Sequence, residues 1–165
     1  MADPLPPRMS DTRTVVTGHD EKGNAIILKD TSNQATPVGD GTFLNALWSS
    51  SDTPARIDGD ANKVPDPADG FKGNVFNTYD IPPRYQGPMH RTVTLDYIVV
   101  LRGQVVLTLD DGKRVTFAEG DTTVQRGTMH SWANESDQWA RLVSVMLPAR
   151  QLTVDGKALE PYWPF

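Results

Sequence analysis

Residues 87–134 constrain the fold most, because apolar and polar side chains alternate through them between tight-turn signals. Successive side chains of an extended strand face opposite sides, so His90 and Asp96 share one face of an early strand. By the same parity, His130 and Trp132 share one face of a later strand. If both faces point into one barrel, two imidazoles, a carboxylate and an indole converge in a small space. That convergence is the predicted functional site.

Short segments with strand character recur outside this stretch. The sequence predicts a hairpin from residues 12–17 and 25–28, and further strands at 42–48, 74–80 and 139–146. Glycine and aspartate turn signals separate strands at a spacing of roughly 8–12 residues, and helical periodicity is almost absent. This pattern predicts an all-β barrel or jelly roll, and the lack of an internal repeat predicts one barrel.

One domain is expected for a chain of 165 residues. Residues 1–12 are polar and rich in proline, so we expect a flexible N-terminal segment before a barrel domain at 13–165. Three of the last four residues are aromatic, which predicts a tail docked on the barrel or on a partner subunit. Residues 49–73 carry many Ser, Asp, Pro and Gly, which indicates either a lid over the barrel mouth or a plain surface loop.

Composition argues against several classes of partner. The chain has 21 acidic and 16 basic residues, and the basic residues are scattered, so nucleic acid is not expected as a partner. No apolar run approaches the roughly 20 residues of a membrane-spanning helix, so no membrane is expected either. Cysteine is absent, which excludes disulfides and thiolate metal sites and makes a cytoplasmic location the default expectation.

The start of the stretch resembles the first motif of the cupin family, whose members are small β-barrels. That motif is Gly, five residues, His-x-His, three or four residues, Glu, six residues, Gly. The chain keeps the spacing from the first histidine onward in the run His90-x-Thr92, three residues, Asp96, six residues, Gly103. Thr92 replaces the second histidine and Asp96 replaces the glutamate, while the leading glycine, Gly87, lies closer than the motif asks.

The end of the stretch resembles the second cupin motif, which closes with Pro-x-Gly, two residues, His, three residues, Asn. The chain has Gln125-x-Gly127, two residues, His130, three residues, Asn134, so only the proline differs in this part. The run from Gly120 is one residue short. The resemblance implies a single cupin jelly-roll β-barrel, also called a double-stranded β-helix.

Cupins typically hold a metal with three histidines and one glutamate. This chain has only His19, His90 and His130, and His19 lies outside both motifs. The remaining set of His90, Asp96 and His130 suits a divalent metal such as Zn, Fe, Mn or Ni. The alternative is a metal-free site in which His90 and Asp96 form a hydrogen-bonded pair, and the carboxylate raises the pKa of the imidazole.

Several neighbours are candidates for substrate binding. Arg91 could bind a substrate carboxylate or be solvated, and the Thr92 hydroxyl could hold a water molecule. Gln125 could reach inward from the bend before the second motif. Trp132 could fill the core or form a wall on which a ligand stacks. The resemblance implies that Asn134 braces a neighbouring loop.

The leading functional hypothesis is an enzyme of the lyase type that decarboxylates or dehydrates a small carbonyl compound or carboxylic acid. His90, Asp96 and His130 would supply acid–base chemistry or hold a divalent metal. An Fe(II)-dependent oxygenase using the same three residues is the second hypothesis. The third is a non-catalytic module that binds a small ligand. A small-molecule substrate and a homodimer are expected.

Overall fold

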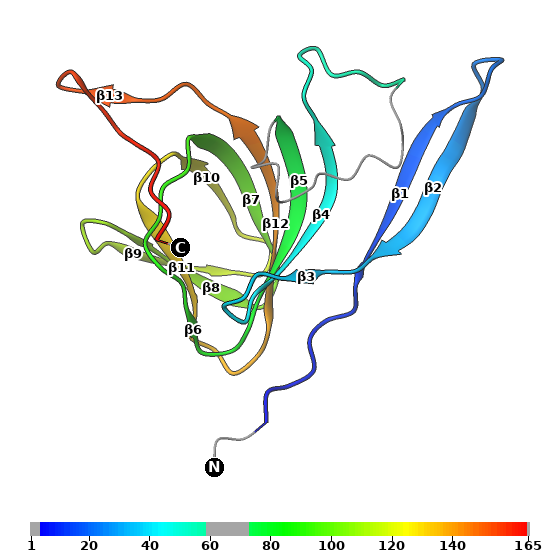
Figure 1. Ribbon diagram of the computed structural model, residues 1–165. Coiled ribbons are helices and arrows are strands. Elements are labelled where there is room, and N and C mark those ends of the chain that lie inside the picture. Colours follow the sequence, from blue (N-terminus) through cyan, green and yellow to red (C-terminus); the bar gives the residue numbers. More distant parts are fainter. Residues whose placement is uncertain (1–3, 59–72, 165) are drawn as a thin grey trace.

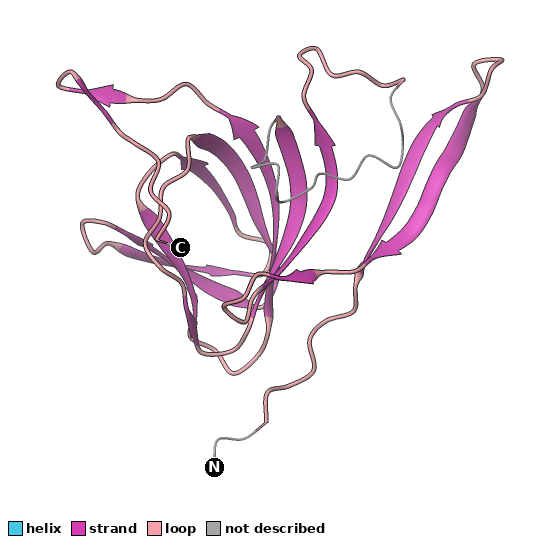
Figure 2. Cartoon of the chain, viewed as in Figure 1, coloured by secondary structure: helices cyan, strands magenta, loops and turns pink. Residues whose placement is uncertain are grey.

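The structure is a computed structural model that describes residues 4–58 and 73–164 (Figure 1). Its regular elements in these ranges are all strands (Figure 2), so the all-β prediction is confirmed. The strands are β1 Thr12–His19, β2 Ala25–Asn33, β3 Thr36–Pro37, β4 Phe43–Ser50, β5 Asn74–Ile81, β6 Tyr85–Gln86, β7 Thr94–Arg102, β8 Gln104–Leu109, β9 Arg114–Ala118, β10 Thr122–Arg126, β11 His130–Asn134, β12 Ala140–Pro148, β13 Thr153–Val154 and β14 Lys157–Ala158.

Two antiparallel sheets form the barrel. One sheet has the strand order β10-β7-β12-β5-β4-β3, and the other has the order β6-β11-β8-β9. The sheets face each other across the interior (Figure 1). Strand β7 belongs to the first sheet and β8 to the second, so the chain changes sheet at the turn between them. This arrangement is the jelly roll that the strand pattern predicted.

One end of the interior is packed with apolar side chains. Leu142 lies opposite both Tyr79 and Val100 in the register of β12 with its two neighbours. Burial of each such aliphatic side chain stabilises the fold by about 1.5–3 kcal/mol, so this cluster holds the two sheets together. Its buried members are Ile81, Ile98, Val100, Val105, Leu107, Trp132, Ala140 and Leu142.

The other end of the interior is polar, although it is built from the same strands. Two residues along β12 from Leu142, Ser144 donates a hydrogen bond of 2.7 Å to the Asn77 side chain. Two residues further, Met146 lies opposite Asp96 of β7, and Gln125 of β10 lies opposite Asp96 on the other side. The side-chain alternation of β7 and β12 therefore brings polar groups to the interior as soon as the apolar rows end.

Residues 4–11 have no regular secondary structure, but they contact the outer face of the larger sheet. The Trp139 indole donates to the carbonyl oxygen of Pro6 at 2.8 Å, and Arg8 pairs with Asp80 at 2.7 Å. Asp80 is buried and also accepts two hydrogen bonds from Arg141. A buried carboxylate needs such partners, so Arg8 and Arg141 together stabilise its charge.

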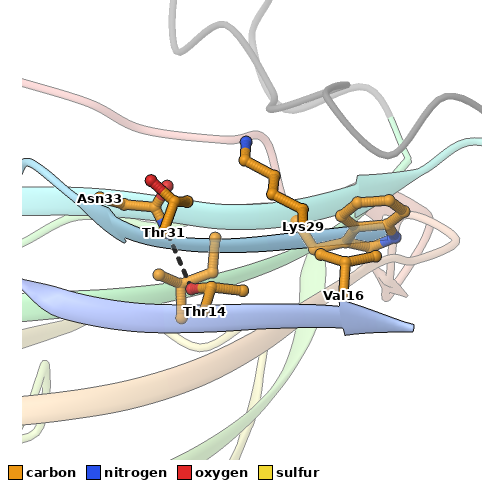
Figure 3. Close-up of a pocket in the computed structure, with 7 residues that line it drawn as sticks. Thr14, Val16, Lys29, Thr31 and Asn33 are labelled. Carbon is orange, nitrogen blue, oxygen red and sulfur yellow. Dashed lines mark hydrogen bonds between the residues drawn. The ribbon is translucent and has the colours of Figure 1, made fainter. Parts of the chain in front are cut away.

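The predicted N-terminal hairpin is confirmed as β1 and β2, which project from the barrel beside β4 (Figure 1). Thr14, Val16, Lys29, Thr31 and Asn33 line a small groove where the hairpin meets Leu47 and Trp48 of β4 (Figure 3). Asn33 donates to the Thr14 hydroxyl at 2.8 Å.

Exposed apolar side chains also line the outer face of β7 and β10, namely Tyr97, Val99, Leu101 and Val124. The homodimer stays a prediction.

The predicted lid lies in residues 49–73. Of these, residues 51–58 have no regular secondary structure, and the lid prediction falls largely on residues 59–72, which lie outside the described residues. Among the residues described, none forms a helix long and apolar enough to cross a bilayer.

Candidate functional site

The two motif histidines meet at the polar end of the barrel. His130 is the first residue of β11, and His90 lies in the segment that precedes β7. Their backbones exchange two hydrogen bonds, from His90 N to His130 O at 2.8 Å and from His130 N to His90 O at 3.0 Å. The ring centroids are 4.3 Å apart. The predicted convergence of the two imidazoles is confirmed.

Backbone carbonyl groups determine which nitrogen of each ring carries the proton. The Nδ1 atom of His90 lies 3.0 Å from Pro88 O, and the Nδ1 atom of His130 lies 3.0 Å from Thr128 O. A carbonyl oxygen can only accept a hydrogen bond, so both Nδ1 atoms carry a proton. In the neutral form each Nε2 atom therefore keeps a lone pair for a substrate or a metal.

Both imidazoles are neutral at pH 7. Burial lowers the pKa of His90, and the hydrogen bond to Pro88 only partly opposes this. Burial lowers the pKa of His130 to about 4, with a further contribution from the neighbouring His90 ring. The expectation that a carboxylate raises the pKa of His90 is wrong, because burial dominates and the ring bonds to a carbonyl group instead.

Asp96 is the carboxyl group of the polar end. It is buried in β7, and its Oδ1 atom has no hydrogen-bond partner in the part of the chain that the structure describes. Burial raises the pKa of Asp96 to about 6, although a hydrogen bond from Thr94 acts in the opposite direction. The predicted hydrogen-bonded pair of His90 and Asp96 is therefore wrong: His90 bonds to Pro88, and one carboxyl oxygen is left without a partner.

The donor atoms fit a divalent metal only in part. Divalent metals bind imidazole through a ring nitrogen, and both Nε2 atoms are of this kind. Metal-bound histidines usually donate a hydrogen bond from their other ring nitrogen, as His90 and His130 do from Nδ1. Within residues 4–58 and 73–164, however, no three His, Asp or Glu side chains are grouped so that they could hold one ion. The predicted set of His90, Asp96 and His130 is not assembled, because Asp96 stands apart from the two imidazoles.

The bend before the second motif is held by Gln125 and Gly127. Gln125 is buried, and its side-chain amide donates to the Thr128 hydroxyl. Gly127 has a φ of 59°, and a Cβ atom there would lie 3.3 Å from Thr92 O. Since Thr128 supplies the carbonyl that bonds His130, this bend sets the orientation of the ring. Gln125 does reach inward, where it positions the bend.

Three further candidates have structural partners. The Thr92 hydroxyl bonds the Thr94 hydroxyl at 2.7 Å. Trp132 belongs to the buried apolar cluster. Its ring meets the Phe117 ring at a tilt and the His130 ring edge-on, so it fills the core beneath the site. Asn134 donates to Ile81 O at 3.1 Å and to Gln138 O at 2.8 Å, which confirms its predicted role as a loop brace.

The aromatic tail docks on the barrel at the site itself. The backbones of Arg91 and Tyr162 exchange two hydrogen bonds, of 2.8 and 2.9 Å. The Arg91 guanidinium reaches Glu160 O at 3.5 Å, so its visible contact is with the tail. Trp163 packs its indole against the His90 ring, with centroids 4.6 Å apart. Reasoning from the sequence missed Trp163 as a site residue, because the alternation within strands carries no information on where a tail docks.

Three interior residues of the larger sheet were also missed, namely Asn77, Ser144 and Met146. Asn77 donates to the Met146 sulfur at 3.7 Å and accepts from Ser144. Ser144 and Met146 alternate with Leu142 along β12, so the same two-residue parity that indicated Asp96 could have found them.

The comparisons with known proteins agree on one family. Residues 77–146 match the family model described as a cupin domain. The chain is 31% identical over 157 residues to the cupin-domain-containing oxidoreductase fogC of Aspergillus ruber, covering 89% of this chain and 77% of that protein. It is 32% identical over 155 residues to the oryzines biosynthesis cluster protein J of Aspergillus oryzae, covering 87% of each.

Among solved structures, the polyketide cyclase RemF from Streptomyces resistomycificus superposes with a TM-score of 0.52 at 20% identity. The superposition covers 81% of this chain and 80% of that one. At that identity the likeness concerns the fold alone, and it agrees with the two facing sheets described above.

Proposed function

The chain belongs to the cupin superfamily, and on that premise we propose that it is a lyase that dehydrates a small hydroxy-carbonyl compound by proton transfer. One observation carries the proposal: two neutral imidazoles are in ring contact, and each has its Nδ1 atom committed to a carbonyl group. Their Nε2 atoms are therefore bases in a buried site that also contains a carboxylic acid with a raised pKa.

The chemistry divides between one imidazole and the carboxyl group. With a pKa lowered to about 4, His130 is a weak base, so we assign the base to His90. Its Nε2 atom takes the proton next to the substrate carbonyl, and the electron pair of that C–H bond forms the new double bond. Asp96 gives its proton to the departing hydroxyl group, which leaves as water. With a pKa of about 6, roughly a tenth of Asp96 is protonated at pH 7.

The combination of a base and an acid favours dehydration over decarboxylation. Loss of carbon dioxide breaks a C–C bond and needs no base, whereas elimination of water needs a base for the proton and an acid for the hydroxyl. His90 lies beside the smaller sheet and Asp96 lies in the larger one. The proposal therefore places the substrate between the two sheets, with one sheet supplying the base and the other the acid.

A metal-dependent oxidoreductase is the second candidate, and it is supported by the similarity to fogC of Aspergillus ruber, which is named an oxidoreductase. His90 and His130 would be two of the ligands through their Nε2 atoms. A bound divalent metal would supply Lewis-acid or redox chemistry. Such a metal site also needs a third ligand. Among the described residues, no further His, Asp or Glu side chain is grouped with the two imidazoles. A ligand-binding module without turnover is the third candidate.

One assay separates the three candidates. The protein is dialysed against EDTA and offered a panel of 3-hydroxy ketones in D2O, and NMR follows both deuterium uptake next to the carbonyl and the formation of enone. We expect the wild type to catalyse both after chelation. His90→Gln should lose both by about a hundredfold or more, whereas Asp96→Asn should lose the elimination and keep exchange. His19→Gln, outside the site, is the matched control.

Two results would overturn the lyase proposal. Activity that returns only with Fe(II) and consumes oxygen would establish the oxidoreductase. Binding of a panel compound with no turnover, and with affinity unchanged in His90→Gln, would establish the binding module.

A further inference from the structure

Backbone hydrogen bonds hold the tail on the barrel. After the turn between β13 and β14, the Leu159 amide donates to Leu152 O at 2.8 Å, which directs the chain back to the barrel. Tyr162 then pairs through its backbone with Arg91, immediately next to His90. The tail runs beside the segment between β6 and β7 (Figure 1). This backbone pairing places Trp163 next to His90.

Trp163 adds a third ring to the site. The His90 ring contacts the His130 ring, at a centroid distance of 4.3 Å, and the Trp163 indole, at 4.6 Å. The indole meets the imidazole edge-on, with an interplanar angle of 72°. Trp163 is 53% exposed, so part of its indole is accessible to a ligand while another part contacts the imidazole assigned as the base.

We propose that Trp163 is a substrate-contacting residue, and that the exposed part of its indole selects substrates whose carbonyl group is conjugated to an aromatic or other planar unsaturated group. A flat π system beside an indole gains offset-stacked or edge contacts that a saturated ring of the same size does not make. The selection rests on the proposed function, since it places such a carbonyl compound beside His90.

Ligand binding tests the proposal without turnover. Acetophenone and cyclohexyl methyl ketone share the carbonyl and the ring size and differ in unsaturation. Their affinities are measured by titration of the His90 and His130 imidazole NMR signals. We expect the wild type to prefer acetophenone by about tenfold. Trp163→Ala should remove the preference, and Trp163→Phe should keep part of it, because a smaller ring remains.

Tyr162→Ala is the matched control, because it removes an exposed ring from the neighbouring position and leaves the backbone pairing possible. It should keep the full preference. If Trp163→Ala does not fold, the reduced ketone preference expected of Trp163→Phe tests the proposal instead. An unchanged preference in Trp163→Ala, or wild-type imidazole signals that neither ketone shifts, would overturn the role of Trp163. A ketone preference that follows Trp163 in a protein with no dehydratase activity would refute the lyase alone.

Discussion

The two ends of the barrel interior are built from the same strands and behave in opposite ways. At the packed end, Leu142 and Val100 face each other across β12 and β7. Two rows further along the same strands, Met146 and Asp96 face each other instead. The packed end gains free energy by removing apolar surface from water, whereas the polar end buries groups that need partners. Stability and chemistry are thus separated along the barrel axis.

Three groups at the polar end are perturbed by burial. One oxygen of Asp96 lacks a partner within the described residues, and burial lowers the pKa of both His90 and His130. Desolvation of this kind is typical of functional sites, where a protein accepts a cost in stability for reactivity. The contrast between the two ends leads to four predictions, in order of decreasing effect.

The largest effect is expected at the packed end. Leu142→Ala removes a buried side chain and should lower the free energy of unfolding by about 3 kcal/mol, measured by urea denaturation. Leu101→Ala makes the same chemical change on the exposed outer face of β7 and should cost about 0.5 kcal/mol. Equal losses in the two variants would mean that this end is not the packed core.

At the polar end, replacing a charged group should stabilise the protein. The pKa of Asp96 is raised from 3.8 to about 6, so the folded state binds more protons than the unfolded state between these values. Its contribution to stability is therefore present below pH 4 and is lost as the pH rises through 6. Asp96→Asn avoids this loss and should be more stable than the wild type by about 2 kcal/mol at pH 7, and by much less at pH 4. A difference that does not change with pH would contradict the account.

The contribution of His130 to stability should change with pH in the opposite direction to that of Asp96. Its pKa is lowered from 6.5 to about 4, so the unfolded state binds more protons and stability is lost as the pH falls from about 6.5 to 4. In the wild type, the pH dependences of stability caused by Asp96 and His130 partly cancel. Urea midpoints between pH 4 and 8 should therefore rise with pH in Asp96→Asn and fall with pH in His130→Asn. Parallel curves would show that the two groups are not both buried.

The smallest effect concerns the bend that positions His130. Gly127→Ala and Gly112→Ala both place a side chain at positive φ, and each should cost about 1 kcal/mol in stability. A Cβ atom at Gly127 also meets Thr92 O at 3.3 Å, whereas one at Gly112 meets nothing within 4 Å. Only Gly127→Ala should therefore shift the imidazole NMR signals of His130. The comparison fails if both variants shift them equally.

Much of the fold and part of the site could be predicted from the sequence. Two-residue alternation indicated the barrel, and the spacing of the motifs indicated that His90 and His130 meet. The same parity suggested a pair of His90 and Asp96, and that pair does not form. The physical reason is that β7 begins only at Thr94, so His90 bridges to β11 in the smaller sheet while Asp96 pairs within the larger one.

Tertiary contacts account for the rest. The strand pattern put Trp132 on the face of His130 without showing how deep it lies, and its place in the apolar cluster depends on side chains from both sheets. The contact of Trp163 with His90 joins residues far apart in the chain through two backbone hydrogen bonds at Tyr162.

The most direct test of the account measures the protonation of the two imidazoles by long-range ¹H–¹⁵N NMR as a function of pH, with the signal of the exposed His19 as reference. We expect His90 and His130 both to carry their proton on Nδ1 at pH 7, and His130 to titrate near pH 4. A proton on Nε2 of either ring, or titration of His130 at or above pH 6.5, would contradict it.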